Sequence, residues 1–270
     1  MRTRRRSRGF ALLVVLWTVA LLALLGSHIT AAARRAASLS TLLHDAAVAE
    51  ALADGMVDEA ILRLLDPSPR GWKADGARRS VRLGGGRAEV TVLDHGGRIN
   101  PAMATPQLMA VVLRLEGVEE KRAVQLAAAL MDWRTIGDKP TPGGAKAAEY
   151  RAAGLPYGPP NEYYRSPEEL GLVLGMTPDV LVRLAPHVSV WNTGRIDLSH
   201  ADPVVARAMQ ETGGGVGQLQ QSPEGQMAPM IVEIDAQVTP PGARARRRAV
   251  VRINLADAAA PRPWHVLSWN

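Results

Sequence analysis

The sequence contains no cysteine, which excludes disulfide bonds, thiolate metal ligands and cysteine nucleophiles. This absence does not fix the cellular compartment, because a chain of 270 residues can bury enough apolar surface to fold without covalent cross-links. Aromatic residues are also scarce, at 4% of the chain. The sequence therefore indicates no aromatic recognition site.

Motifs of well-known enzyme classes are missing as well. The chain has no Gly-x-Ser-x-Gly, HExxH or P-loop pattern. Six histidines are scattered without a shared spacing: His28, His44, His95, His187, His200 and His265. We therefore expect a protein that is not an enzyme and has no catalytic residues. A Ser/His/Asp cluster assembled only by folding stays open as an alternative.

Acidic residues are absent from the first nine positions, where five arginines stand: Arg2, Arg4, Arg5, Arg6 and Arg8. The whole chain has a formal charge of +6 and a pI near 10.1, values that by themselves favour a nucleic acid or anionic lipid as partner. Taking these five charges from +6 leaves only +1. The excess positive charge thus belongs mostly to this leader, where it favours a cytoplasmic N-terminus.

A long apolar segment follows the leader. Residues 10–33 contain no Asp, Glu, Lys or Arg, and Arg34 and Arg35 end the segment. This length is sufficient for a helix to cross a bilayer. A secretory signal has a shorter apolar core followed by small residues at the cleavage site, whereas Gly9 here precedes the apolar segment. The pattern predicts a single membrane-spanning helix at residues 10–33.

The helical pattern continues beyond the membrane-length segment. Apolar residues recur at spacings of three and four up to Leu65, the opposite face is largely acidic, and Asp66-Pro67-Ser68-Pro69 ends the pattern. Two interpretations stay open. One is a plain membrane anchor followed by an amphipathic helix, and the other is a continuous helix whose second half packs on a sheet.

The rest of the chain alternates between strand and helix signals. We predict strands at 80–83, 88–94, 188–191, 230–238, 248–255 and 264–269. We predict helices at 105–115, 119–133 and 203–210, further helix starts at Ser166 and Thr177, and a loop at 137–160. This order indicates an α/β (α+β) protein in which an all-α domain is inserted between strands. The predicted parts are 1–9 (leader), 10–33 (membrane span), 34–100 (helix and first strands), 101–186 (helical domain) and 187–270 (remaining strands, with a linker at 213–229).

The start of the chain, Arg8-Gly9-Phe10-Ala11-Leu12-Leu13-Val14-Val15-Leu16, resembles the leader of type IV pilin-like proteins. The resemblance implies that a prepilin peptidase cuts after Gly9 and that Phe10 is methylated. Most members of this family carry glutamate where this chain has Val14, and its loss is expected of a subunit at the end of a filament. The residues expected to act in assembly are Val14, Leu16, Trp17 and Leu21.

A second resemblance lies in the helical domain and the turns beside it. The segments that carry it are Arg98–Ala102, Met131-Asp132-Trp133, Pro142–Ala145, Glu149-Tyr150, Leu155-Pro156-Tyr157, Asn161, Ser166–Met176 and Val190–Gly194. They are similar to the protein K family, the large minor pseudopilins of type II secretion systems. The resemblance implies a pilin-like fold, with a long N-terminal helix packed on an antiparallel sheet and interrupted by a helical domain. It also implies a place at the tip of a short periplasmic filament.

The same resemblance implies partners and a location. The partners are other minor pseudopilins through the N-terminal helix, the prepilin peptidase and the inner membrane. The secretin channel or secreted substrates would face the helical domain. The location is the inner membrane, crossed once, with a periplasmic C-terminal domain.

Calcium is the one cofactor that the resemblance implies, bound by acidic residues of the helical domain. Hard cations need several carboxylate and carbonyl oxygens that converge in one loop. The candidates are Asp132, Asp138 and Glu149. Arg134 and Lys146 stand where further acids would be expected, and the alternative is that these acids are solvated loop residues.

Two segments, 115–120 and 173–178, look like helix-hairpin-helix units. A membrane-anchored DNA-binding protein is therefore an alternative function, because such hairpins bind phosphate through backbone amides. Glu116, Glu119 and Glu120 surround the first hairpin and would repel phosphate. We expect these hairpins to pack helices together and expect no nucleic acid as partner.

Overall fold

The computed structural model describes residues 7–192, 194–213, 229–254 and 260–270. The predictions for leader residues 1–6 and linker residues 214–228 lie outside this part. The chain forms two compact units. The first contains the chain up to Met56 together with Ser80–Glu89 and Ala236–Arg247, and the second contains Val57–Arg79, Val90–Asp235 and Arg248–Asn270.

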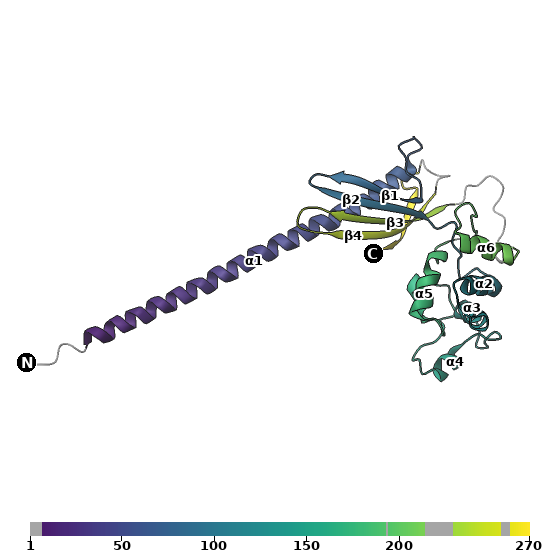
Figure 1. Cartoon of the computed structure of the whole chain (residues 1–270), viewed down its shortest axis with the longest axis horizontal. Coiled ribbons are helices and arrows are strands. Elements are labelled where there is room, and N and C mark those ends of the chain that lie inside the picture. Colours follow the sequence, from purple (N-terminus) through teal and green to yellow (C-terminus); the bar gives the residue numbers. More distant parts are fainter. Residues whose placement is uncertain (1–6, 193, 214–228, 255–259) are drawn as a thin grey trace, which may run out of the picture. The chain divides into compact units, whose positions relative to one another are not determined.

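Helix α1 (Ser7–Leu65) is continuous, which agrees with the second of the two interpretations left open by the sequence (Figure 1). Within its apolar part, hydroxyl groups donate to carbonyl oxygens one turn earlier, for example from Thr18 to Val15 at 2.8 Å and from Ser27 to Leu24 at 2.7 Å. These bonds satisfy polar groups that would otherwise be costly in an apolar environment. The helix is long and apolar enough to cross a membrane, and its most apolar window has a mean hydropathy of 2.5.

The second half of α1 buries one face. Small and apolar residues at helical spacing are buried there: Ala49, Ala53, Met56, Val57, Ala60, Ile61 and Leu64. In the first unit, α1 passes beside the turn between β3 and β4 (Figure 1), and Asp54 forms an ion pair with Arg247. A Cβ added to Gly242, which has φ +84°, would lie 2.6 Å from Asp45 Oδ2. Glycine therefore permits this close approach, and the interpretation in which the helix packs on the sheet is confirmed.

One five-stranded sheet has its strands in chain order, β1-β2-β3-β4-β5. The strands are β1 (Asp75–Leu83), β2 (Gly86–Asp94), β3 (Met230–Thr239), β4 (Ala245–Ile253) and β5 (Trp264–Trp269). β5 pairs antiparallel with β4 and forms the predicted edge, with a register shift between Val250 and Val251. β1 begins at Asp75, earlier than predicted, and the Asp75 carboxylate accepts hydrogen bonds from the Ala77 amide and from Arg79.

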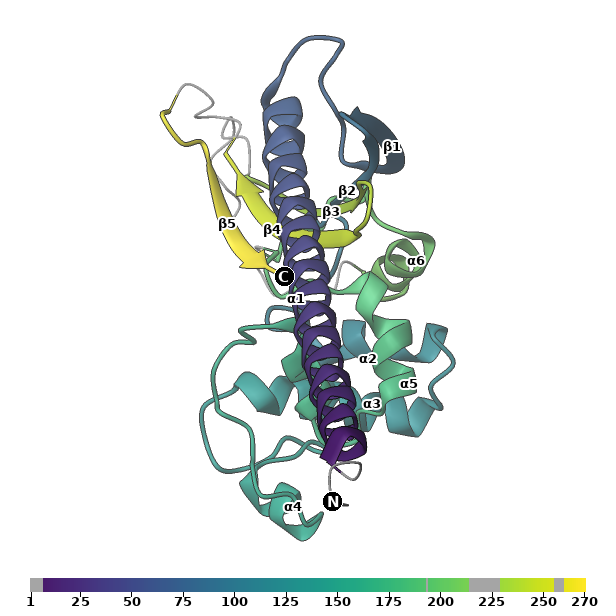
Figure 2. The ribbon, with the colours of Figure 1, turned by 90° about the vertical axis from the view of Figure 1, so that its left-hand side faces the viewer.

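The helical block lies between β2 and β3 in the chain. It consists of α2 (Pro106–Leu115), α3 (Glu120–Arg134), α4 (Ala147–Ala152), η1 (Pro167–Leu172), α5 (Pro178–Leu184), η2 (Ala185–His187) and α6 (Pro203–Glu211), where η marks a 3-10 helix. α2 packs against α3 and α6, and α4 lies at the far end of the group (Figures 1 and 2). Tyr150 and Leu184 are among the fully buried core side chains.

Three details of the block differ from prediction. The loop expected at 137–160 contains α4, whose first turn is capped by Glu149. The start predicted at Ser166 leads to the 3-10 helix η1. The strand predicted at 188–191 is reduced to a single parallel bridge between Ile99 and Val188, because η2 precedes it and a turn follows it.

Candidate functional site

Residues 10–33 of α1 present an uncharged, mostly apolar surface in the first unit. Trp17 is 70% exposed, and the other residues predicted to act in assembly, Val14, Leu16 and Leu21, are exposed as well. Phe10 is also exposed, and Gly9 belongs to the first turns of the helix. Burying such side chains is worth roughly 25 cal/mol per Å² of apolar surface. This surface is therefore suited to lipid or to other apolar helices.

A buried polar cluster joins three segments of the second unit. His95 Nδ1 lies 2.9 Å from Ser189 Oγ, and His95 Nε2 lies 3.1 Å from Glu233 Oε2. Arg98 Nη1 lies 2.8 Å from His95 Nε2 and 3.4 Å from Glu233 Oε2. Folding thus assembles a Ser-His-acid group that the scattered histidines in the sequence did not reveal. No spacing signal could have found it, because its members stand far apart in the chain.

The burial and pairing of this cluster favour a structural role. His95 is 1% and Ser189 is 2% exposed, so a substrate has no access to the serine hydroxyl. The hydrogen bond to His95 and the nearby Arg98 hold the pKa of Glu233 at about 2, although burial opposes this shift. Burial lowers the pKa of His95. Near neutral pH the cluster therefore contains a neutral imidazole between a carboxylate and a guanidinium group.

Two asparagine side chains form hydrogen bonds with backbone groups beside the cluster. Asn192 Nδ2 donates to the carbonyl oxygens of His95 at 2.9 Å and Arg98 at 2.7 Å. Asn100 Nδ2 donates to the carbonyl oxygen of Asn192, and its Oδ1 accepts from the Ala102 amide. These residues come from the two turn motifs that carry the resemblance, and the structure brings both motifs together. Thr193, in the second motif, lies outside the described residues.

The cluster predicts a loss of stability in acid. The ordinary pKa values of 6.5 for His95 and 4.5 for Glu233 are both lowered by folding. Below each ordinary value the unfolded chain binds more protons than the folded chain, so the free energy of unfolding falls as the pH falls. The contribution of His95 is complete above pH 6.5, and that of Glu233 is lost between pH 4.5 and about 2. Urea denaturation from about pH 7 to about pH 3 measures this slope, and a flat profile would contradict the assignment.

The three calcium candidates do not converge. Asp132 is buried and accepts a hydrogen bond from the Thr141 amide at 3.0 Å, Glu149 accepts one from the Lys146 amide at 2.8 Å, and Asp138 is exposed. Across the described residues, no group of three or more His, Asp or Glu side chains could hold a metal ion. The ammonium of Lys146 lies among oxygens of the same loop. The residues present therefore do not fit a calcium ion.

The first hairpin of the helix-hairpin-helix pattern is used within the protein. Gly117 takes φ +80° between α2 and α3, and the Glu119 carboxylate accepts hydrogen bonds from the Lys121 and Arg122 amides, both at 3.0 Å. These are amides at the start of a helix, where a phosphate would otherwise bind. Glu116 contacts His187 at 3.1 Å. The geometry favours helix packing over phosphate binding.

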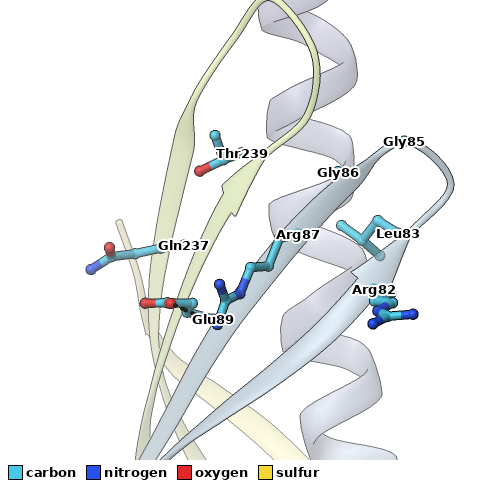
Figure 3. Close-up of a pocket in the computed structure, with 8 residues that line it drawn as sticks. All are labelled: Arg82, Leu83, Gly85, Gly86, Arg87, Glu89, Gln237 and Thr239. Atoms are coloured by element: carbon cyan, nitrogen blue, oxygen red, sulfur yellow. Dashed lines mark ion pairs between the residues drawn. The ribbon is translucent and has the colours of Figure 1, made fainter.

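A shallow hollow of about 600 Å³ lies beside the β1–β2 turn in the first unit (Figure 3). Arg82, Arg87 and Glu89 line it together with Gln237 and Thr239 of β3. Arg87 Nη2 lies 3.6 Å from Glu89 Oε1. Positively and negatively charged side chains both line this open surface. The hollow therefore does not indicate a ligand of one charge.

Comparisons with known proteins agree on one family. Residues 90–193 match the family model described as type II secretion system protein K. The type II secretion system protein K of Klebsiella pneumoniae is 30% identical over 203 residues, which cover 68% of this chain and 62% of that protein. This chain therefore spans less than two thirds of that relative's length.

A solved structure shares the fold. It is a chain of the GspK-GspI-GspJ complex from the type II secretion system of enterotoxigenic Escherichia coli, with a TM-score of 0.56 and 17% identity. The match covers 88% of this chain and 98% of that one. It supports the predicted α+β fold, in which a long N-terminal helix accompanies a sheet interrupted by helices. The matched domain and the 30% identical relative both indicate a protein K of a type II secretion system.

Proposed function

We propose that this chain caps the tip of a periplasmic pseudopilus and helps to initiate its assembly for the export of folded proteins. The observation that carries the proposal is the exposed apolar surface in the first half of α1. The same helix continues into a second half that buries one face. Such a surface is stable in a bilayer before assembly and among similar helices afterwards. The similarity to type II secretion system protein K supports the same role.

The N-terminus is proposed to be processed as in pilins. A prepilin peptidase cuts after Gly9, the new terminus at Phe10 is methylated, and α1 stays on the mature protein in the inner membrane. Val14 has no carboxylate to pair with the terminal amine of a neighbouring subunit. An unpaired acidic residue at the centre of a membrane helix costs about 2.5 kcal/mol or more. Valine at this position suits a subunit that no further subunit covers.

The proposed partners follow from the same surface. The related solved structure is a complex with GspI and GspJ, and we propose the corresponding pseudopilins of this chain's own host as partners through α1. The helical block is proposed to face the secretin or secreted proteins from the periplasm. The proposal needs no catalytic step, and the buried Ser189 supports this because its hydroxyl is enclosed.

Co-purification tests the partner assignment. The full chain is expressed with the I and J pseudopilins of its host and isolated in detergent, and we expect one complex of all three. Replacing exposed Leu39 and Leu42 of α1 by serine removes apolar contact area, so recovery should fall roughly tenfold or more.

A matched double variant controls for the loss of exposed apolar residues in general. Leu172 on η1 and Val182 on α5 are likewise exposed, and serine at both should leave recovery unchanged. The partner assignment fails if the wild-type chain does not co-purify with the two pseudopilins, or if both double variants behave alike.

A further inference from the structure

The Lys146 side chain is buried in the helical block. Its residue is only 2% exposed, and it precedes the first turn of α4. The Nζ donates to the Asp132 carbonyl oxygen at 2.6 Å, to the Thr135 carbonyl oxygen, and to Asn161 Oδ1 at 2.7 Å. A lysine ammonium has three donors, and these three oxygens use all of them.

The oxygens around Lys146 form an environment for a cation. Asp132 and Thr135 stand at the end of α3, where carbonyl groups lack helical partners and the helix dipole is negative. The Asp132 carboxylate is buried nearby, and its Oδ1 has no hydrogen-bond partner. A buried carboxylate needs a compensating positive charge. The Lys146 ammonium supplies a positive charge that interacts electrostatically with this carboxylate.

Asn161, whose side chain accepts a hydrogen bond from Lys146, has an unusual backbone conformation. Its φ of +60° is the one positive value of a non-glycine residue in the described part of the chain. Its amide donates to the Trp133 carbonyl oxygen at 3.1 Å. The left-handed backbone costs energy that the surrounding contacts must offset. The ammonium thereby connects the end of α3, the start of α4 and the segment after α4.

We propose that the Lys146 ammonium is the structural cation of the helical block, and that the block holds its 137–160 segment without calcium. The surrounding ligands, two carbonyl oxygens, one amide oxygen and a nearby carboxylate, are of the kinds that calcium prefers. An ammonium at their centre occupies that space and carries charge of the same sign as a metal ion. In this chain an internal side chain therefore replaces a bound ion.

Thermal unfolding of the full-length protein in detergent tests the proposal. The wild-type midpoint should be the same in excess calcium chloride and in excess EDTA. Lys146→Met keeps the length of the side chain and removes the charge and all three donors. Its midpoint should fall by roughly 5–10 °C in both buffers, because the three buried oxygens lose their donor and the Asp132 carboxylate loses the nearby positive charge.

Lys139→Met is the matched control, because Lys139 is an exposed lysine of the same segment and should leave the midpoint unchanged. Limited proteolysis gives a second measurement: cleavage within 137–160 should be faster in Lys146→Met than in the other two proteins, with or without calcium. Calcium-dependent stabilisation or protection of the wild-type protein would overturn the proposal. So would a Lys146→Met protein as stable and as resistant as the Lys139→Met control.

Discussion

Replacing Gly9 by leucine is expected to leave the uncleaved precursor in the membrane and to abolish secretion by the host. The residues before the proposed cut carry five positive charges that hold the N-terminus in the cytoplasm. A precursor that keeps them cannot withdraw the start of α1 from the bilayer into a filament, because charged side chains would have to enter hydrocarbon. Secreted protein in the medium should fall to the level of a strain without the gene.

Intact-mass spectrometry measures processing independently of secretion. The wild-type protein should begin at Phe10 with one added methyl group, and the Gly9→Leu protein should retain the leader. Gly26→Leu is the matched control, because Gly26 lies in the same helix and a Cβ there meets no atom within 4 Å. It should be cleaved normally. The processing hypothesis is wrong if the Gly9→Leu protein also begins at Phe10, or if the wild-type chain is cut near Ala31.

Replacing Glu233 by alanine is expected to lower the free energy of unfolding by about 2–3 kcal/mol. Glu233 contacts His95 at 3.1 Å, Arg98 at 3.4 Å and Arg248 at 3.2 Å. Its side chain is only 17% exposed, so water compensates little for the lost partner. Urea denaturation of the full chain in detergent, followed by near-ultraviolet circular dichroism, measures the change.

The control for this prediction is an ion pair at the surface. Glu162 and Arg165 form a pair whose side chains are both more than half exposed. Glu162→Ala should change the free energy of unfolding by at most about 0.5 kcal/mol, because exposed pairs are screened by water and salt. Equal effects of the two substitutions would show that the buried cluster contributes no more than a surface pair.

Much of the helical structure could be predicted because its signals are local. Thr105 precedes Pro106, and its hydroxyl accepts a hydrogen bond from the Leu108 amide at 3.2 Å, as expected at a helix start. α6 likewise begins at Pro203 after Asp202. The strand predicted at 188–191 was wrong beyond its bridge at Val188, because η2 precedes the segment, a turn follows it, and the Ser189 side chain bonds to His95.

The sequence by itself determined the apolar segment and the end of the helical pattern before Pro67, because hydropathy and helix hydrogen bonding depend on neighbours a few positions away. It also carried the motifs of the family. Only the tertiary structure decided that His95, Ser189 and Glu233 meet, and that Lys146 lies where calcium was considered. Composition and periodicity do not predict such contacts. Only the fold determines which distant side chains lie together in a buried environment, where charges are weakly screened.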